Sequence, residues 1–238
     1  MGPYQMRCRS SGFSIQGPAG GRGFQIDEGP CPMSGVLIAF EGLDCAGKSL
    51  LLRKLPKLLS GMTRRIVICG EYQSPFARLF RGSRLKTTSP FLKTYLFAVD
   101  RAWTYEKRCM PSLERNRIVL WDRYVDSALT YRSVEFSAKS DRGLWNLVRA
   151  INRPFRRPDL TFYISISPET SMRRARKSHR SQPYSLGFLR SVAAEYRALA
   201  RRCRYVTIDG NKCISEVVSE VALIIRERFG GRKHATPH

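Results

Sequence analysis

The sequence predicts an α/β fold in which a five-stranded parallel sheet carries helices on both faces, as in a three-layer sandwich. Two observations predict this fold. Five short apolar runs, each of the length of a buried strand, alternate with longer segments of helical pattern between Gly35 and Phe229. In addition, a glycine-rich turn and a helix start follow the first run directly, which is how a strand of such a sheet leads to a ligand at its carboxyl edge.

In chain order, the expected strands are residues 36–40, 65–69, 118–121, 160–166 and 205–208. The expected helices are residues 49–59 and 90–110, a region that opens at Ser127, a helix that starts at Pro168, and residues 188–202 and 214–229. Pro168 suits the first turn of a helix, and Glu169 beside it complements the helix dipole. No apolar run is long enough to span a bilayer, so we expect no membrane segment.

The two ends of the chain differ in composition from this core. Residues 1–33 contain Gly- and Pro-rich stretches that cannot bury enough apolar surface to order themselves, so we predict a disordered tail. A misassigned start codon upstream of Met33 and a weak targeting segment are the alternatives for this tail. We predict that residues 34–229 form a single domain and that residues 230–238 are a frayed end.

The formal net charge of +23 limits the class of partners. Such a charge is typical of nucleic-acid binding, but the sequence has no aromatic-basic RNA-binding signature and no zinc-finger spacing. A solvated basic surface with functional arginines around a phosphate site explains the charge equally well, so we do not expect nucleic acid as the main partner. The seven cysteines are scattered without a C-x-x-C pair, which favours reduced thiols and a cytoplasmic location.

The most specific motif is the run Gly-Leu-Asp-Cys-Ala-Gly-Lys-Ser, which matches the pattern G-x-x-x-x-G-K-[ST] of a phosphate-binding loop. We expect its eight residues to bind ATP: Gly42, Leu43, Asp44, Cys45, Ala46, Gly47, Lys48 and Ser49. The glycines allow the backbone N–H groups to turn around a phosphate. Lys48 reaches the outer phosphates, and Ser49 ligates Mg²⁺. A strand before the loop and a helix after it argue against a chance match, so we predict a P-loop NTPase fold.

A second group of polar residues, Asp122-Arg123-Tyr124, follows the third expected strand. A carboxylate at this edge of the sheet, here Asp122, can hold Mg²⁺ or its water ligands. Arg123 beside it can neutralise charge on a phosphoryl group during transfer. Taken alone the tripeptide is a weak signal, because charged residues often end strands.

Together these motifs resemble those of the thymidylate kinase family. Residues 40–49 are similar to the family's Phe-Glu-Gly-x-Asp phosphate loop, and residues 122–124 to its Asp-Arg-Tyr/His signature. Residues 96–103 resemble its base-binding helix, and residues 158–163 match the strand that leads to its lid. The resemblance covers about residues 35–229 in the family's order. It implies an ATP-dependent kinase that converts dTMP to dTDP, with Mg²⁺ as cofactor, and it suggests a homodimer.

The resemblance also assigns roles in acceptor binding. Asp44 would hydrogen-bond the sugar 3′-hydroxyl, and Phe97 would stack on the base. Arg101 would donate to a base carbonyl, and Arg123 would bridge the acceptor phosphate and the transferring phosphoryl group. The expected acceptor residues are Asp44, Glu71, Phe97, Arg101, Arg123 and Tyr131. The alternatives from the residues alone are that Phe97 and Trp103 are core residues and that Arg101 is a solvated surface charge.

Residues 172–180 form a dense cationic stretch after the fourth strand, and we interpret it as an arginine-rich lid. The family places a catalytic arginine either in the phosphate loop or in the lid. Position 45 of the loop is Cys, so Arg176 and Arg180 in the lid are the candidates. The catalytic set is therefore Lys48, Asp122, Arg123, Arg176 and Arg180, with Ser49 and Asp122 on the metal. A solvated basic helix is the alternative interpretation of this stretch.

The sequence departs from the family pattern in the parts that contact the acceptor. Glu71 has no adjacent arginine, the lid segment 181–185 keeps only an aromatic residue, and Arg132 replaces a glutamine or threonine. Two other functions therefore stay open. One is a deoxynucleoside kinase, which phosphorylates an uncharged 5′-hydroxyl with Glu71 as the base. The other is a non-catalytic nucleotide-binding protein on the same scaffold.

Overall fold

The parallel sheet predicted from the sequence is confirmed. The computed structural model describes residues 34–80, 89–137, 142–179 and 182–230. Within them the sheet has the strand order β2-β3-β1-β4-β5, and every neighbouring pair is parallel. The strands are β1 (Val36–Glu41), β2 (Ile66–Gly70), β3 (Ile118–Asp122), β4 (Leu160–Ser165) and β5 (Val206–Asp209). Each expected strand is present to within one or two residues at its ends.

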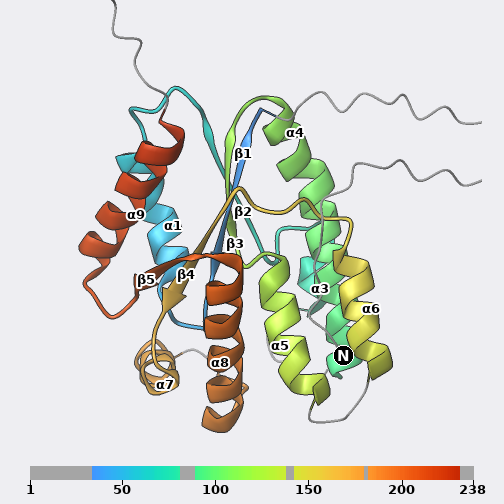
Figure 1. Cartoon of the computed structure of the whole chain (residues 1–238). Helices are drawn as coiled ribbons and strands as arrows, with labels where there is room; N and C mark the ends of the chain where they lie inside the picture. Colours follow the sequence, from blue (N-terminus) through green and yellow to red (C-terminus); the bar gives the residue numbers. More distant parts are fainter. Residues whose placement is uncertain (1–33, 81–88, 138–141, 180–181, 231–238) are drawn as a thin grey trace, which may run out of the picture. The chain divides into compact units, whose positions relative to one another are not determined.

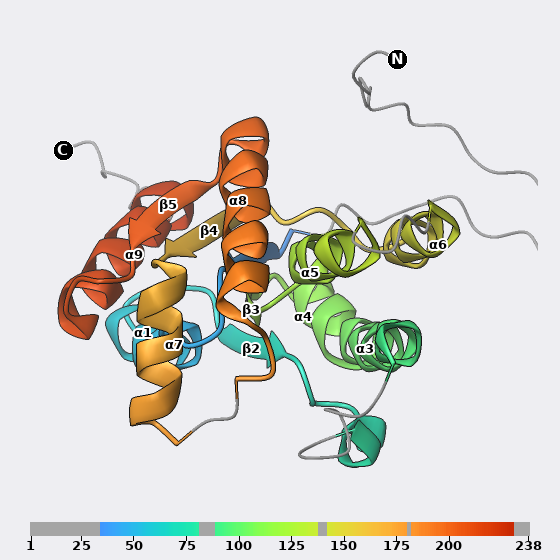
Figure 2. The ribbon, with the colours of Figure 1, turned by 90° about the horizontal axis from the view of Figure 1, so that it is seen from below.

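Helices cover both faces of this sheet, as expected (Figure 1). One face carries α1 (Lys48–Leu58) and α9 (Ile214–Phe229), and Figure 2 gives a second view of the same layers. The opposite face carries the remaining long elements: α3 (Pro90–Thr104), η2 (Tyr105–Cys109), α4 (Met110–Glu114), α5 (Val125–Ser137), α6 (Arg142–Asn152) and α8 (Leu186–Cys203). Two further helical segments, η1 (Pro75–Phe80) and α7 (Pro168–Lys177), follow the carboxyl ends of β2 and β4.

Two helical predictions need correction. The segment expected as one helix over residues 90–110 contains a π-helical turn, η2, between α3 and α4. Pro111 in the first turn of α4 has no N–H to donate to a carbonyl four residues earlier, which fits the wider turn just before it. The region after strand β3 holds two helices, and the first of them begins at Val125 rather than at Ser127.

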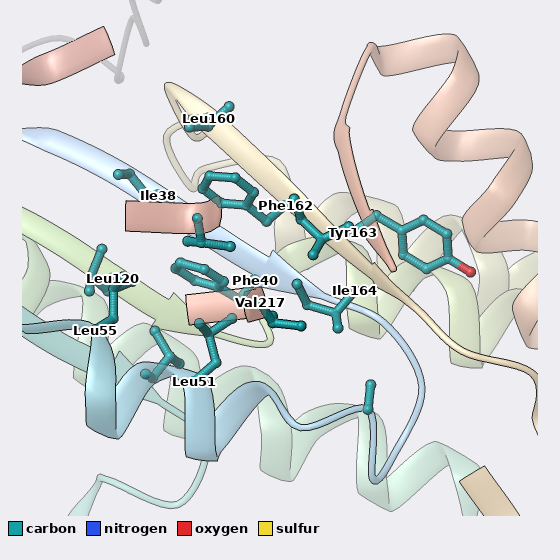
Figure 3. Close-up of a cluster of buried hydrophobic side chains, with 14 of the residues drawn as sticks. Ile38, Phe40, Leu51, Leu55, Leu120, Leu160, Phe162, Tyr163, Ile164 and Val217 are labelled. Atoms are coloured by element: carbon teal, nitrogen blue, oxygen red, sulfur yellow. The ribbon is translucent and has the colours of Figure 1, made fainter. Parts of the chain in front are cut away.

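The hydrophobic core lies on both sides of the central strands. Alternate residues of β1 face opposite sides, so Ile38 and Phe40 pack toward α1 and α9 while Leu37 and Ala39 pack toward η2 and α4. Figure 3 shows the first of these clusters, in which Phe40 stacks on Phe162 of β4 with ring centroids 5.2 Å apart. β1 is buried on both faces. A ligand can therefore approach it only at its carboxyl end, where the chain leaves the sheet.

The predicted tails, residues 1–33 and 230–238, lie outside the described residues except for Gly230, which is the C-cap of α9. Among the helices that the structure does describe, none is both long enough and apolar enough to cross a membrane.

Candidate active site

The phosphate loop connects β1 to α1 and depends on glycine at two positions. Gly42 has a φ of 137°, and a Cβ added there would lie 2.5 Å from the backbone oxygen of Ile164. Gly47 has a φ of 97° and caps the N-terminus of α1. Both conformations are disfavoured for residues with a side chain, and at Gly42 the neighbouring strand adds a direct clash. The loop is therefore shaped by its backbone, as the motif predicts.

Lys48 turns back over this loop from the first position of α1. Its ammonium group donates to the carbonyl oxygens of Gly42 and Leu43, at 2.9 and 2.7 Å. Only 4% of the residue is exposed. Burial, with the positive charge of Arg123 as the second cause, lowers the pKa of Lys48 to about 8. The group is thus held at the centre of the loop rather than in solvent.

Ser49 and Asp122, the two residues predicted to hold the metal, lie next to each other. The Ser49 hydroxyl donates to Asp122 Oδ2 at 2.7 Å. Asp122 ends β3, between Phe40 of β1 and Gly70 of β2, so the sheet register brings it to the phosphate loop. The other carboxylate oxygen, Oδ1, is buried and has no hydrogen-bond partner among the described residues. A buried carboxylate oxygen without a partner suits a bound cation or water.

Arg123 stands between the phosphate loop and the residues expected to bind the acceptor. Its guanidinium forms an ion pair with Asp44, and its Nε lies 4.0 Å from a carboxylate oxygen of Glu71. The same group lies 5.6 Å above the ring of Tyr131. Burial alone would lower the pKa of Arg123, but the carboxylates of Asp44 and Glu71 and the nearby tyrosines hold it well above its usual value. Arg123 therefore stays charged and is fixed from several sides.

A cavity of about 310 Å³ opens beside Arg123. Its walls include all six residues that the sequence analysis assigns to the acceptor: Asp44, Glu71, Phe97, Arg101, Arg123 and Tyr131. Phe97 is half-buried on the wall and packs edge-on against Tyr72, with ring centroids 5.7 Å apart. Arg101 is 6% exposed, so its interpretation as a solvated surface charge is wrong. The structure thus brings the predicted acceptor residues together around one space.

Glu71 follows β2 and faces the same cavity. Desolvation raises the pKa of its carboxyl group to about 7, although Arg123 acts in the opposite direction. The carboxyl group can therefore exchange a proton near neutral pH, which is a property of a general base. The loop behind it is strained, because Tyr72 has a φ of 61°.

Two carboxylates that support the site were missed as functional residues in the sequence analysis. Asp100 on α3 accepts hydrogen bonds from the backbone N–H groups of Tyr72 and Ser74, at 2.6 and 2.9 Å, and so fixes the loop that carries Glu71. The only sequence signal for this role is the position of Asp100 directly before Arg101. An acidic residue directly before a predicted base-binding arginine is a weak signal of such a contact.

Glu41, at the end of β1, is the second of these carboxylates. It is fully buried and accepts hydrogen bonds from the backbone N–H of Tyr124, at 2.9 Å, from the Ser127 hydroxyl, and from the Tyr196 hydroxyl at 3.1 Å. Burial, with the neighbouring Asp126 as second cause, raises the pKa of Glu41 to about 7. The bond to Tyr124 holds the turn in which Arg123 has a φ of 61°. Glu41 therefore fixes the backbone on which Arg123 stands.

Of the two predicted lid arginines, Arg176 and Arg180, the structure describes only the first. Arg176 is exposed on α7, and its guanidinium makes no hydrogen bond or ion pair with the described part of the chain. Arg180 lies outside the described residues. Arg174, which the sequence analysis did not select, reaches the phosphate loop instead: it donates to the Gly210 carbonyl at 2.8 Å and to the Cys45 carbonyl at 3.4 Å. The roles of Arg176 and Arg180 stay predictions.

The remaining departure from the family pattern, Arg132, also lies at the cavity. It is buried on α5 and forms an ion pair with Glu135 one turn later, and Tyr184 lines the cavity beside it. Its charge is therefore already paired within the protein.

Comparison with known proteins agrees with this geometry. A family model described as "Thymidylate kinase" matches residues 40–221. A protein of Pyrobaculum aerophilum described as "Probable thymidylate kinase" is 31% identical over 195 residues, which cover 80% of this chain and 96% of the relative. A protein of Methanosarcina barkeri with the same description is 32% identical over 205 residues, 82% of this chain and 98% of the relative. The "Thymidylate kinase" of Chlorobium limicola is 28% identical over 214 residues, with coverage of 82% and 96%.

Proposed function

The chain belongs to the thymidylate kinase family, and we propose that it transfers the γ-phosphoryl group of ATP to dTMP, giving dTDP and ADP. One observation carries the proposal at the level of the site. Arg123 lies between a phosphate-binding loop and a cavity that holds Phe97 and Arg101. A cation in this position can contact both the phosphoryl group that is transferred and the phosphate that accepts it.

On the donor side, the backbone N–H groups of the loop and the N-terminus of α1 would hold the phosphates of ATP. Lys48 now donates to two loop carbonyls, and we propose that the ammonium group moves its hydrogen bonds to the outer phosphates when ATP binds. The lowered pKa of about 8 leaves Lys48 mostly charged at neutral pH, so it retains its attraction for phosphate.

The residues next to the loop fit a Mg²⁺ ion. Ser49 and Asp122 provide hard oxygen ligands, and one buried oxygen of Asp122 has no hydrogen-bond partner within the described residues. Mg²⁺ commonly takes one or two protein ligands and completes its coordination with water and substrate phosphates. Ser49 and Asp122 would hold the ion, and bound Mg²⁺ would neutralise charge on the phosphates of ATP.

On the acceptor side, the cavity of about 310 Å³ is at the lower end of the range for small-molecule pockets. We propose that the thymine base stacks on Phe97 while Arg101 donates to a base carbonyl, and that Asp44 binds the sugar 3′-hydroxyl. Arg123 would then bind the acceptor phosphate and stabilise the transferred group. In this arrangement the protein acts by positioning and charge neutralisation, which is what phosphoryl transfer requires.

A second candidate function is favoured by Glu71. Its pKa of about 7 suits a base that removes a proton from the 5′-hydroxyl of a nucleoside, and no arginine stands beside it in the sequence. A deoxynucleoside kinase needs such a base and needs no contact to an acceptor phosphate. A non-catalytic nucleotide-binding protein is the third possibility that an assay must separate.

Coupled release of ADP from Mg-ATP tests these functions with the full chain. Separate assays would contain dTMP, dUMP, dCMP, dGMP, AMP or thymidine, with the Lys48→Ala variant as background control. We expect turnover to be dominated by dTMP. Turnover of thymidine without any monophosphate would refute the proposal in favour of the nucleoside kinase. ATP binding without turnover of any acceptor would refute both enzymatic functions.

We also propose a homodimer, an arginine-rich lid over the donor and a cytoplasmic location, as the family resemblance implies. Support for the dimer comes from an exposed apolar stripe on α3, made by Phe91, Leu92, Tyr95 and Val99. Light scattering after size-exclusion chromatography should give twice the mass of the chain for the wild type. Val99→Arg should lower the measured mass toward that of one chain. A monomeric wild type would exclude the dimer.

A further inference from the structure

We propose that Asn152, at the end of α6, is a positioning residue that holds Arg101 and thereby sets which nucleobase the acceptor cavity selects. This inference rests on the proposed function, because it concerns the base of the acceptor. Asn152 lies on α6, a helix that the sequence did not distinguish from α5 and in which no site residue was predicted.

The contact between the two residues is short and buried. Arg101 Nη1 donates to Asn152 Oδ1 at 2.6 Å, although the residues are 51 positions apart in the chain. Arg101 is 6% exposed and Asn152 is 5% exposed, yet both line the cavity. A hydrogen bond shielded from water in this way is costly to break, because both groups would be left without partners.

The orientation of the Asn152 amide is fixed by a second hydrogen bond. Its Nδ2 donates to the carbonyl oxygen of Val148, one turn earlier in α6, at 2.7 Å. A guanidinium has only donors, so the amide oxygen must face Arg101 and the amide nitrogen must face Val148. Rotation of the amide would lose both bonds. Phe155, whose ring centroid lies 5.9 Å from the Arg101 guanidinium carbon, supports the same group from another side.

The chemistry of Asn152 matters as well as its position. An amide holds the guanidinium without neutralising it, whereas a carboxylate at the same place would form an ion pair. Among the described residues, no carboxylate lies within 4.0 Å of the Arg101 guanidinium nitrogens. The remaining N–H donors of Arg101 are thus available to a carbonyl of a neutral nucleobase in the cavity.

A fixed group that can only donate discriminates between pyrimidines. Thymine and uracil carry an acceptor, O4, where cytosine carries an amino group that also donates. If Arg101 is held in one place, dCMP would bring two donors against each other. If Arg101 can swing away, the penalty on dCMP falls. Asn152 therefore acts on the ratio of kcat/KM for dTMP to that for dCMP.

Three variants of the full chain test this role. Asn152→Leu removes the hydrogen bonds at similar volume, Asn152→Asp keeps an oxygen toward Arg101, and Asn146→Leu alters an exposed asparagine on the same helix. We expect Asn152→Leu to lower the dTMP/dCMP ratio of kcat/KM about tenfold while the KM for ATP stays unchanged. Asn152→Asp should keep the ratio near that of wild type but raise the KM for dTMP, and Asn146→Leu should change neither value.

A second readout does not depend on turnover. In ¹⁵N NMR spectra, a guanidinium held through Nη1 gives a resolved Arg101 Nη1–H signal that exchanges slowly with water, and Arg101→Lys assigns it. We expect Asn152→Leu to lose this signal while thermal unfolding shows a folded protein. An unchanged signal, or an unchanged dTMP/dCMP ratio, would overturn the inference. A wild type that retains the signal but turns over no dTMP would instead refute the proposed function and leave the positioning role standing.

Discussion

The phosphate loop and the acceptor cavity meet at Arg123, but the loop depends more on contacts between sequence neighbours, although Arg174 also donates to its Cys45 carbonyl from α7. In the loop, Lys48 bonds to carbonyl groups only five and six residues earlier, and two glycines allow the backbone to fold that way. In the cavity, the fixing contacts join residues far apart: Tyr72 to Asp100 and Arg101 to Asn152. Substitutions in the loop should lower kcat strongly, because the loop holds the transferred phosphate, whereas substitutions in the cavity should give graded losses of binding and selectivity.

The largest effect should come from Lys48→Ala. Removing a preorganised cation that stabilises transferred charge typically costs 10²–10³-fold in rate, and we expect a fall in kcat of about that size. Lys54→Ala, on the exposed face of the same helix, is the matched control and should keep wild-type turnover. Both variants should unfold near the wild-type temperature. Turnover by Lys48→Ala at the wild-type rate would contradict the assignment of the donor site.

Arg123→Ala should have the second largest effect, and it tests the place where the phosphate loop meets the acceptor cavity. Arg123 pairs with Asp44 of the phosphate loop and faces Glu71 at the acceptor cavity. Its loss therefore removes a positive charge that the transferred phosphoryl group and the acceptor phosphate would both contact. We expect kcat to fall about a hundredfold and the KM for dTMP to rise. Steady-state kinetics with each substrate varied separately measures both. A change in the KM for dTMP at constant kcat would restrict Arg123 to acceptor binding.

Phe97→Ala should have a smaller effect that is confined to the cavity. Stacking of a base on an aromatic side chain contributes about 1–3 kcal/mol, so we expect the KM for dTMP to rise about tenfold. The KM for ATP is the internal control and should not move. If both KM values rose together, the cavity and the loop would be coupled more tightly than their contacts indicate.

The smallest expected effect is a change in how stability depends on pH. Glu41 has a pKa of about 7 in the folded protein, above the ordinary value of 4.5, so the folded state binds the extra proton between these values. Stability from this group is therefore fully present below pH 4.5 and is lost as the pH rises through 7. Glu41→Gln removes that titration.

The melting temperature from pH 5 to pH 8 measures this effect. We expect the wild type to lose stability over this range and Glu41→Gln to show a shallower decline. Part of the decline should persist in the variant, because the pKa of Glu71 is raised in the same direction. Identical slopes in the two proteins would contradict the assignment to Glu41.

The same contrast explains what could be predicted from the sequence. The strands and the phosphate loop are local patterns, because apolar runs and glycine spacing are determined by neighbouring residues. The π-helical turn at Tyr105–Cys109 was not predicted, since the sequence analysis expected one continuous helix over residues 90–110. The partners of Arg101 and of the Tyr72 loop were not predicted either. Their hydrogen bonds span 26 to 51 residues and leave no pattern in any one segment.

Tyr72 and Arg123 share a backbone conformation that has a consequence for protein engineering. Both have a φ of 61°, which costs about 1 kcal/mol or more for a residue with a side chain. A search for thermostable variants would favour glycine at both positions, since glycine relieves this strain. The same exchange would remove an aromatic wall of the cavity and the cation that lies between the cavity and the phosphate loop. Heat resistance gained at these two positions would be gained at the expense of catalysis.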